Sequence, residues 1–273
     1  MPGPGLRNPL RDASWAWIFI RTPISTPTPA ARRTATGGRR YGASSTRPGK
    51  RVVDVGCGGG IYARAWAGLG AAQVTGVDFS AEMVAAARER TGQAAGVRFA
   101  QGTAQRTGLP DGCADVVFQR ALVHHLPEFS PAFTEARRLL RPGGVLIVQD
   151  RTLEDACLPG SPGHVRGYFF EVFPALRAFE AGRRPDDAAV RAAMQACGFE
   201  AADSFQLWEL RRRYADFAAL AEDLRGRTGR SILHELDDVQ LQTLIDVIGQ
   251  ALGNASPIQE RDRWTLWHAR RPG

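Results

Sequence analysis

Apolar and polar positions change their period in a regular way from Lys50 onward. Short apolar runs that end at glycine or polar residues predict buried strands, and they cover residues 51–55, 72–77, 97–100, 114–118 and 145–148. Apolar positions at helical spacing lie between them, at residues 61–69, 80–90 and 130–140. Five strands that alternate with helices predict a parallel, doubly wound sheet.

The second half of the chain has a weaker pattern. It predicts one more helix at residues 185–197 and two late strands at residues 205–210 and 264–268. Two amphipathic helical segments lie between those strands, at residues 214–224 and 237–252. We therefore predict an α/β fold with a Rossmann-like, doubly wound, mostly parallel seven-stranded sheet. Helical insertions would follow the fifth and sixth strands, at about residues 151–184 and 211–260.

The N-terminal residues differ from the rest in composition and charge. Residues 1–47 contain many Pro, Gly, Ser and Thr without a sustained period, so we expect a disordered basic leader before a domain at 48–273. Its Arg-, Ser- and Thr-rich composition also resembles a transit peptide. Residues 1–51 hold ten of the 35 Lys and Arg but one of the 28 acids, which leaves 25 bases and 27 acids beyond them. A nearly neutral body argues against a nucleic-acid partner.

Cysteine spacing and hydropathy bear on metal binding, cellular location and membrane contact. The four cysteines, at positions 57, 113, 157 and 197, form no CxxC pair and no zinc spacing, so we expect no metal site and a cytoplasmic location. The longest apolar stretch of the leader, residues 15–20, is too short to cross a bilayer, and we expect no membrane partner.

A glycine-rich turn follows the first predicted strand. Glycines at 56, 58 and 60 allow positive φ angles and let a ligand approach the backbone, and Asp78 ends the next strand about twenty residues later. Such an acid can reach ribose hydroxyls. A dinucleotide-binding G-x-G-x-x-G would place its third glycine at Ile61. Asp54 beside the turn would repel a pyrophosphate but suits the ammonium and sulfonium groups of S-adenosylmethionine (SAM).

The string Asp54-Val55-Gly56-Cys57-Gly58-Gly59-Gly60 resembles that of the class I SAM-dependent methyltransferases that act on small molecules. The resemblance covers about residues 50–152, including residues 115–126 and Arg141-Pro142-Gly143-Gly144. It implies that SAM is the cofactor and that the glycine turn lies against its methionine part.

The same resemblance implies roles for further residues. Asp78 would bind both ribose hydroxyls, Phe79 and Met83 would flank the adenine, and Gln119 would lie beside the methionine part. In the segment Gly102-Thr103-Ala104, the backbone N–H of Ala104 would reach adenine N1. Thr103 occupies the position of an acid that usually accepts the adenine amino group, and a hydroxyl accepts more weakly than a carboxylate. The family's helix before the first strand has no counterpart in the periodicity of residues 1–47.

His124 and His125 lie in the loop that, by the resemblance, faces the methyl group. Either histidine could act as a base, which is needed only when the acceptor must lose a proton. The alternative is that one packs under the loop and the other bonds a neighbouring backbone group.

Two more groups have open interpretations. Arg211, Arg212 and Arg213 could clamp an anionic acceptor or form a solvated strand end. The aromatic residues of the first insertion could line a substrate pocket or pack the insertion onto the sheet; they are Tyr168, Phe169, Phe170 and Phe173.

The function that the sequence favours is methyl transfer from SAM to a small-molecule acceptor. A protein or nucleic-acid methyltransferase and a non-catalytic SAM-binding module are the alternatives. The absence of an Asn-Pro-Pro-Tyr-like motif after the fourth strand argues against methylation of base amino groups. Neither the acceptor nor the oligomeric state can be read from the sequence.

Overall fold

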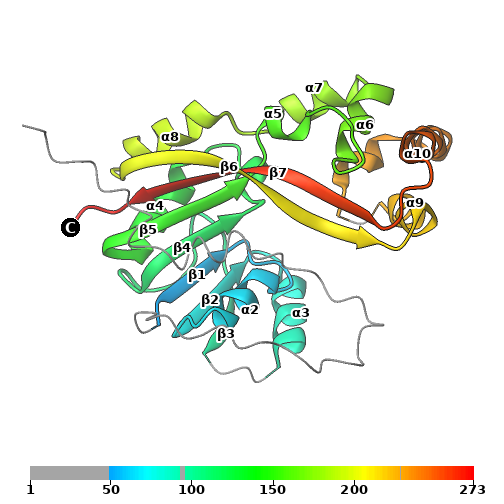
Figure 1. Ribbon diagram of the computed structural model, residues 1–273. Coiled ribbons are helices and arrows are strands. Elements are labelled where there is room, and N and C mark those ends of the chain that lie inside the picture. Colours follow the sequence, from blue (N-terminus) through cyan, green and yellow to red (C-terminus); the bar gives the residue numbers. More distant parts are fainter. Residues whose placement is uncertain (1–48, 93–95, 228) are drawn as a thin grey trace, which may run out of the picture.

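A seven-stranded mixed sheet organises the computed structural model, which describes residues 49–92, 96–227 and 229–273 (Figure 1). The expectations for residues 1–47 lie outside the described residues. Its strands are β1 (Arg51–Val55), β2 (Gln73–Asp78), β3 (Val97–Gln101), β4 (Ala114–Arg120), β5 (Leu140–Asp150), β6 (Glu200–Tyr214) and β7 (Ile258–Arg270). The strand order is β3-β2-β1-β4-β5-β7-β6, and only β7 runs antiparallel to its neighbours. The predicted mostly parallel, doubly wound sheet is confirmed.

Helices cover both faces of this sheet. Helices α2 (Ile61–Gly68) and α3 (Ala81–Thr91) pack on one face, and α4 (Ser130–Leu139) and α8 (Asp187–Ala196) pack on the other. Successive residues of a strand point to opposite faces, so Val52 joins the first core and Val53 the second. Because both faces are buried, strand β1 is apolar on both faces, at Val52, Val53 and Val55, and does not alternate.

A third core lies in a lobe built by the two insertions. After β5 come α5 (Leu153–Ala156), α6 (Arg166–Val172) and α7 (Leu176–Ala181); after β6 come α9 (Phe217–Arg225), the short helix η2 (Ser231–Glu235) and α10 (Asp238–Leu252). The long strands β6 and β7 extend beyond the sheet as a two-stranded ribbon, with α9 and α10 at its far end (Figure 1). Residues of α6, α7, α9, η2 and α10 share one hydrophobic cluster. The two insertions therefore fold together.

The aromatic residues of the first insertion belong to the lobe core. Phe169 and Phe170 are buried there, and Tyr168 and Phe173 pack against the same cluster. Of the two interpretations of these aromatic residues, packing of the insertion fits the structure, although the partner is the second insertion rather than the sheet.

The ribbon is longer than the pattern predicts because charged residues continue its pairing. Arg212 pairs with Glu260 and Glu209 with Asp262 across the two strands. Arg211 Nη1 lies 3.0 Å from Glu260 Oε2 and Arg212 forms an ion pair with Asp223, so both guanidinium groups are engaged within the lobe. A clamp formed by these two arginines would have to break those pairs. No helix in the described ranges is long and apolar enough to cross a bilayer.

We expect Leu244→Ala to lower the free energy of unfolding by about 2–5 kcal/mol, because Leu244 is fully buried in the lobe core. Urea denaturation followed by circular dichroism measures this. The matched control is Val239→Ala on the same helix, where the side chain is 77% exposed and the change should stay within about 0.5 kcal/mol. Equal effects of the two substitutions would contradict the assignment of this core.

Candidate active site

The glycine turn connects β1 to α2 at the carboxyl end of the sheet. The backbone N–H groups of Gly56 and Cys57 both donate to Val77 O, at 2.8 and 3.0 Å, which fixes the turn against β2. Gly60 has φ 74° at the start of α2, and a Cβ there would lie 2.7 Å from Phe99 Cζ. A Cβ on Gly58 would have nothing within 4 Å. The turn is thus packed on one side and open on the other, where a ligand can approach its backbone.

Asp78 ends β2 directly beside the turn. Its Oδ2 accepts a hydrogen bond from Gly58 N at 2.8 Å, and its Oδ1 accepts one from Ser80 N at 3.0 Å. The carboxylate is nearly buried, and each oxygen keeps acceptor capacity beyond its backbone bond. This orientation suits bonds from a pair of vicinal hydroxyls.

Asp54 is a buried acid without a full set of partners. It is 2% exposed, and its Oδ2 has no hydrogen-bond partner among the described residues. Burial raises the pKa of Asp54 to about 7; the negative charge of Asp78 adds to this, while Arg120 and the Ala63 backbone oppose it. An uncompensated buried carboxylate is costly, so this site favours a cationic ligand.

The segments expected at the adenine lie at the same edge. Phe79 and Met83 are large apolar side chains that are 74% and 49% exposed. Gly102 N donates to Asp78 O at 3.0 Å, which brings the segment after β3 next to the acid expected at the ribose. The Thr103 hydroxyl already accepts a bond from Arg106 N at 3.1 Å, so only part of its bonding capacity remains. Ala104 lies within the same local turn, between the two paired residues.

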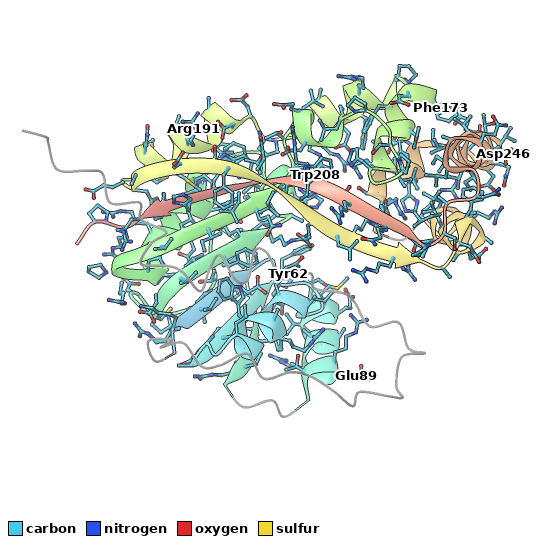
Figure 2. All side chains as sticks on the ribbon, viewed as in Figure 1. Tyr62, Glu89, Phe173, Arg191, Trp208 and Asp246 are labelled. Carbon is cyan, nitrogen blue, oxygen red and sulfur yellow. The ribbon has the colours of Figure 1, made fainter. Side chains whose placement is uncertain are left out.

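Gln119 and Arg120 lie at the end of strand β4, at the carboxyl edge of the sheet. Gln119 is buried, and neither its Nε2 nor its Oε1 has a partner in the part of the chain that is described. Arg120 Nη2 lies 3.0 Å from Glu209 Oε1, and the same carboxylate accepts bonds from Tyr62 Oη at 2.9 Å and from Gln149 Nε2 at 2.8 Å. Glu209 therefore joins the ribbon to the edge of the sheet, and Figure 2 shows Tyr62 between them.

The sequence analysis did not predict the contacts of Arg120 with Glu209 and of Glu209 with Tyr62 and Gln149. Arg120 lies inside a segment that the resemblance covers, so its position in the sequence could have marked it as a residue near the site. Glu209 offered none, because it is 89 residues from Arg120 and its strand was predicted from apolar residues alone. Trp264 was likewise missed; the guanidinium groups of Arg120 and Arg151 both lie over its ring, with their Cζ atoms 4.0 and 4.4 Å from the ring centroid.

The two candidate histidines differ in their surroundings. Both belong to the short helix η1 (Val123–His125), and their rings lie 4.0 Å apart between centroids. His124 Nδ1 lies 2.8 Å from Asp150 Oδ2, whereas His125 is exposed. Partial burial lowers the pKa of His125, and the charges of His124, Arg183 and Arg184 act in the same direction.

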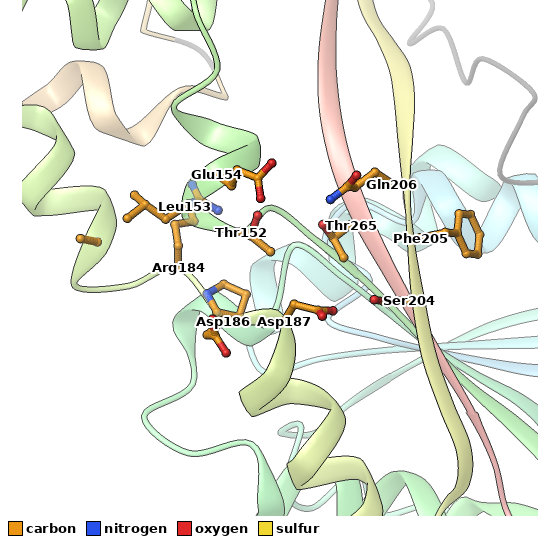
Figure 3. Close-up of a pocket in the computed structure, with 12 residues that line it drawn as sticks. Thr152, Leu153, Glu154, Arg184, Asp186, Asp187, Ser204, Phe205, Gln206 and Thr265 are labelled. Atoms are coloured by element: carbon orange, nitrogen blue, oxygen red, sulfur yellow. The ribbon is translucent and has the colours of Figure 1, made fainter.

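A separate cavity of about 510 Å³ lies on the α8 side of the ribbon (Figure 3). Its acids have structural partners: Asp186 accepts from Ala189 N at 2.9 Å, and Asp187 accepts from Trp267 Nε1 at 2.8 Å. None of the glycine-turn residues lines it. We therefore place the cofactor-binding region at the carboxyl edge of the sheet and not in this cavity.

Comparison with known proteins identifies a methyltransferase domain within the chain. A family model described as a methyltransferase domain matches residues 53–148. These residues therefore form a methyltransferase domain. The chain is 34% identical over 132 residues to a malonyl-[acyl-carrier protein] O-methyltransferase of Serratia marcescens, covering 48% of this chain and 50% of the relative.

Two further proteins extend the comparison. A ubiquinone/menaquinone biosynthesis C-methyltransferase of Methylobacterium nodulans is 36% identical over 145 residues, which cover 52% of this chain and 56% of the relative. The structure of phosphoethanolamine N-methyltransferase 2 from Haemonchus contortus with SAM has a TM-score of 0.51 and 19% identity, covering 84% of this chain and 50% of that one. The chain thus spans about half the length of these curated relatives.

The residues at the edge of the sheet fit SAM, the cofactor of such methyltransferase domains. The Asp54 oxygen and the Gln119 amide, which have no partner among the described residues, are suited to the ammonium and carboxylate of its methionine part. The open side of Gly58 leaves space for that part to approach the turn. Asp78 is suited to accept from the ribose hydroxyls, and exposed Phe79 offers an aromatic face that suits the adenine.

We expect Asp78→Ala to weaken SAM binding by at least about tenfold, because the loss of even one charge-assisted hydrogen bond to ribose costs about 1.5–3 kcal/mol. Isothermal titration calorimetry measures this. Glu89→Ala is the matched control, because Glu89 is an exposed acid on the outer part of α3 (Figure 2). Unchanged affinity in a folded Asp78→Ala protein would refute the ribose assignment.

We expect SAM affinity to fall as pH decreases from 7.5 to 5.5, by up to about tenfold per pH unit below the pKa of Asp54 of about 7. Only the ionised carboxylate attracts the ammonium group. The unliganded fold should respond in the opposite direction: because the folded pKa is raised above 3.8, stability declines as pH rises from about 4 towards 7.

Titrations at several pH values with wild-type protein and Asp54→Asn separate this group from others. The Asn variant should bind SAM weakly and lose the pH dependence. A wild-type slope that persists in Asp54→Asn would assign the titration to another residue.

Proposed function

We propose that this chain transfers the methyl group of SAM to a small-molecule acceptor. The observation that carries the proposal is the buried Asp54 carboxylate, with one unpartnered oxygen, next to a glycine turn that is open on its ligand side. A nucleotide pyrophosphate would meet repulsion there, whereas the ammonium and sulfonium of SAM would compensate the charge.

The cofactor contacts follow from the positions described above. We assign them to the residues at the carboxyl ends of β1 to β4, namely Asp54, Gly56, Gly58, Gly60, Asp78, Phe79, Met83, Thr103, Ala104 and Gln119. When bound, SAM supplies an activated methyl group. The chain's own part is to align donor and acceptor and to exclude water, which supply most of the acceleration in such a displacement.

Three observations support a small acceptor over a macromolecule. The chain from residue 52 onward is close to neutral, with 25 bases and 27 acids, so it lacks the excess of basic residues typical of nucleic-acid enzymes. One curated relative is named for quinone biosynthesis, and another for a malonyl group, a small acceptor even though a carrier protein holds it. The lobe and ribbon overhang the site from one side, where they can hold an acceptor (Figure 1).

The cellular location that we propose is the cytoplasm, which the free thiols of all four cysteines favour.

We expect SAM and S-adenosylhomocysteine to raise the melting temperature while NAD does not. Turnover is then tested with methyl-labelled SAM and fractions of a cell extract that hold either small metabolites, protein or nucleic acid. Label in the metabolite fraction is the expected result. Label only in protein or nucleic acid would favour the alternative enzyme class, and SAM binding without any labelled product would favour a non-catalytic module. Stabilisation by NAD alone would overturn the cofactor assignment.

A further inference from the structure

Asp150 lies behind His124 at the end of β5 and is completely buried. His124 Nδ1 lies 2.8 Å from Asp150 Oδ2 and 3.0 Å from Oδ1. The backbone N–H of His124 also donates to Oδ2, at 3.3 Å. One carboxylate therefore holds both the ring and the backbone of this histidine.

A second set of donors holds Asp150 from the other side. Arg151 N donates to Asp150 Oδ1 at 2.8 Å, and Arg184 Nη1 lies 3.3 Å from the same oxygen. Burial alone would raise the pKa of Asp150, but its bonds to His124 and the charge of Arg184 hold it below the ordinary value. Arg184 is itself buried and paired with Glu180, so the arrangement is rigid.

An ionised carboxylate accepts hydrogen bonds and cannot donate them, so His124 Nδ1 must carry the proton. In the neutral ring this leaves the lone pair on Nε2. All ring hydrogen bonds of His124 to described residues go through Nδ1, which keeps Nε2 available to a ligand. A neutral ring with a fixed tautomer is the arrangement that a general base requires.

The backbone places this ring beside the cofactor-binding edge. Ala121 turns the chain directly after β4 with a left-handed φ of 49°, and its N–H donates to Gln149 O at 2.9 Å. Leu122 packs 3.0 Å from the position of a Cβ on Gly56. A strained non-glycine residue held in this way is common at functional sites. The loop that carries His124 thus contacts the glycine turn itself.

Resting on the proposed function, we infer that the acceptor presents a neutral hydroxyl group, that His124 Nε2 removes its proton, and that Asp150 and Arg184 are positioning residues for His124. The acceptor oxygen forms a bond to the methyl carbon while the carbon–sulfur bond breaks and its electron pair stays on sulfur. The hydroxyl proton passes to Nε2, and Asp150 compensates the imidazolium charge. The proton then leaves to solvent.

A general base helps only those acceptor groups that must lose a proton during methyl transfer. A carboxylate is already ionised near neutral pH, with a pKa of about 4, and needs no base, whereas a phenolic hydroxyl with a pKa of about 10 does. An ammonium acceptor also has to lose a proton; the charges of Arg183 and Arg184 lower the pKa of the neighbouring His125, and that of Asp150, which is bonded to His124, opposes them. A hydroxyl, whose oxygen becomes negative during transfer, is the acceptor that this charge pattern favours.

Identification of the labelled metabolite tests the acceptor class. Product purified after incubation of the extract with methyl-labelled SAM is examined by mass spectrometry and NMR, and a methyl ether is the expected result. A methyl ester, or a methyl group on nitrogen, sulfur or carbon, overturns the hydroxyl assignment while the proposed function stands. Absence of any labelled product in protein that binds SAM counts against the proposed function itself.

The isolated acceptor then serves to test the residues. We expect His124→Gln to lower kcat by about 10²- to 10⁴-fold with SAM affinity unchanged. Asp150→Asn should lower kcat at least about tenfold with little change in KM, and should move the acid limb of the kcat profile to lower pH, because the protonated ring loses its counter-charge. Arg184→Met should lower kcat, and Arg184→Lys should restore most of it.

Controls and alternative outcomes keep these assignments separate. The charged groups that face the pair are His125, Arg120, Arg151, Arg183 and Arg184. His234→Gln, an exposed histidine in the lobe, is the control for loss of a histidine elsewhere. A His124→Gln enzyme within threefold of wild-type kcat overturns the base. An Asp150→Asn enzyme that loses activity without moving the acid limb overturns the positioning role and leaves Asp150 structural.

Discussion

The Glu209 carboxylate joins the ribbon to three other elements of the fold beside the expected cofactor-binding edge. It accepts hydrogen bonds from Tyr62 on α2, Arg120 on β4 and Gln149 on β5, although it lies on the ribbon strand β6. Three donors, from one helix and two strands, thus converge on a single acid of the ribbon. Because the lobe is attached beyond this point, these charge-assisted bonds hold the base of the lobe, together with the pairing of β7 with β5.

A second group of buried charged residues lies inside the lobe. Arg230 and Glu260 are both buried and lie 2.7 Å apart, with Asp223 and the Tyr214 hydroxyl in the same group. Buried ion pairs contribute little net stability over apolar packing, but loss of one partner leaves an uncompensated charge and is strongly destabilising. This network connects α9 and the residue before η2 to the two strands of the ribbon rather than to the sheet core.

Local signals account for what could be predicted from the sequence. The apolar runs of β1 to β5, the Ser80 cap on α3 and the 22-residue span from Gly56 to Asp78 each depend on near neighbours in the chain. The longer ribbon could not be predicted, because its extension pairs charged residues such as Glu209 and Asp262 that carry no strand pattern. The short helices α5 and α7 were missed for a related reason: four and six residues are too few for a period, and tertiary packing stabilises them. The partner of His124 was equally hidden, 26 residues away.

Asp54 and Asp150 show how the surroundings change the pKa of one residue type. Both are buried at carboxyl ends of strands, yet the pKa of Asp54 is raised to about 7 and that of Asp150 is lowered. The difference lies in their partners within the described part of the chain, because Asp54 keeps one oxygen without a partner there, while Asp150 is bonded by His124, Arg151 and Arg184. A carboxylate with an unmet need for positive charge is suited to bind a cationic ligand, and one that is already compensated is suited to orient a base. The glycine motif indicates a carboxylate such as Asp54 from the sequence alone. A carboxylate such as Asp150 is compensated only once the first insertion has folded and brought Arg184 to the end of β5.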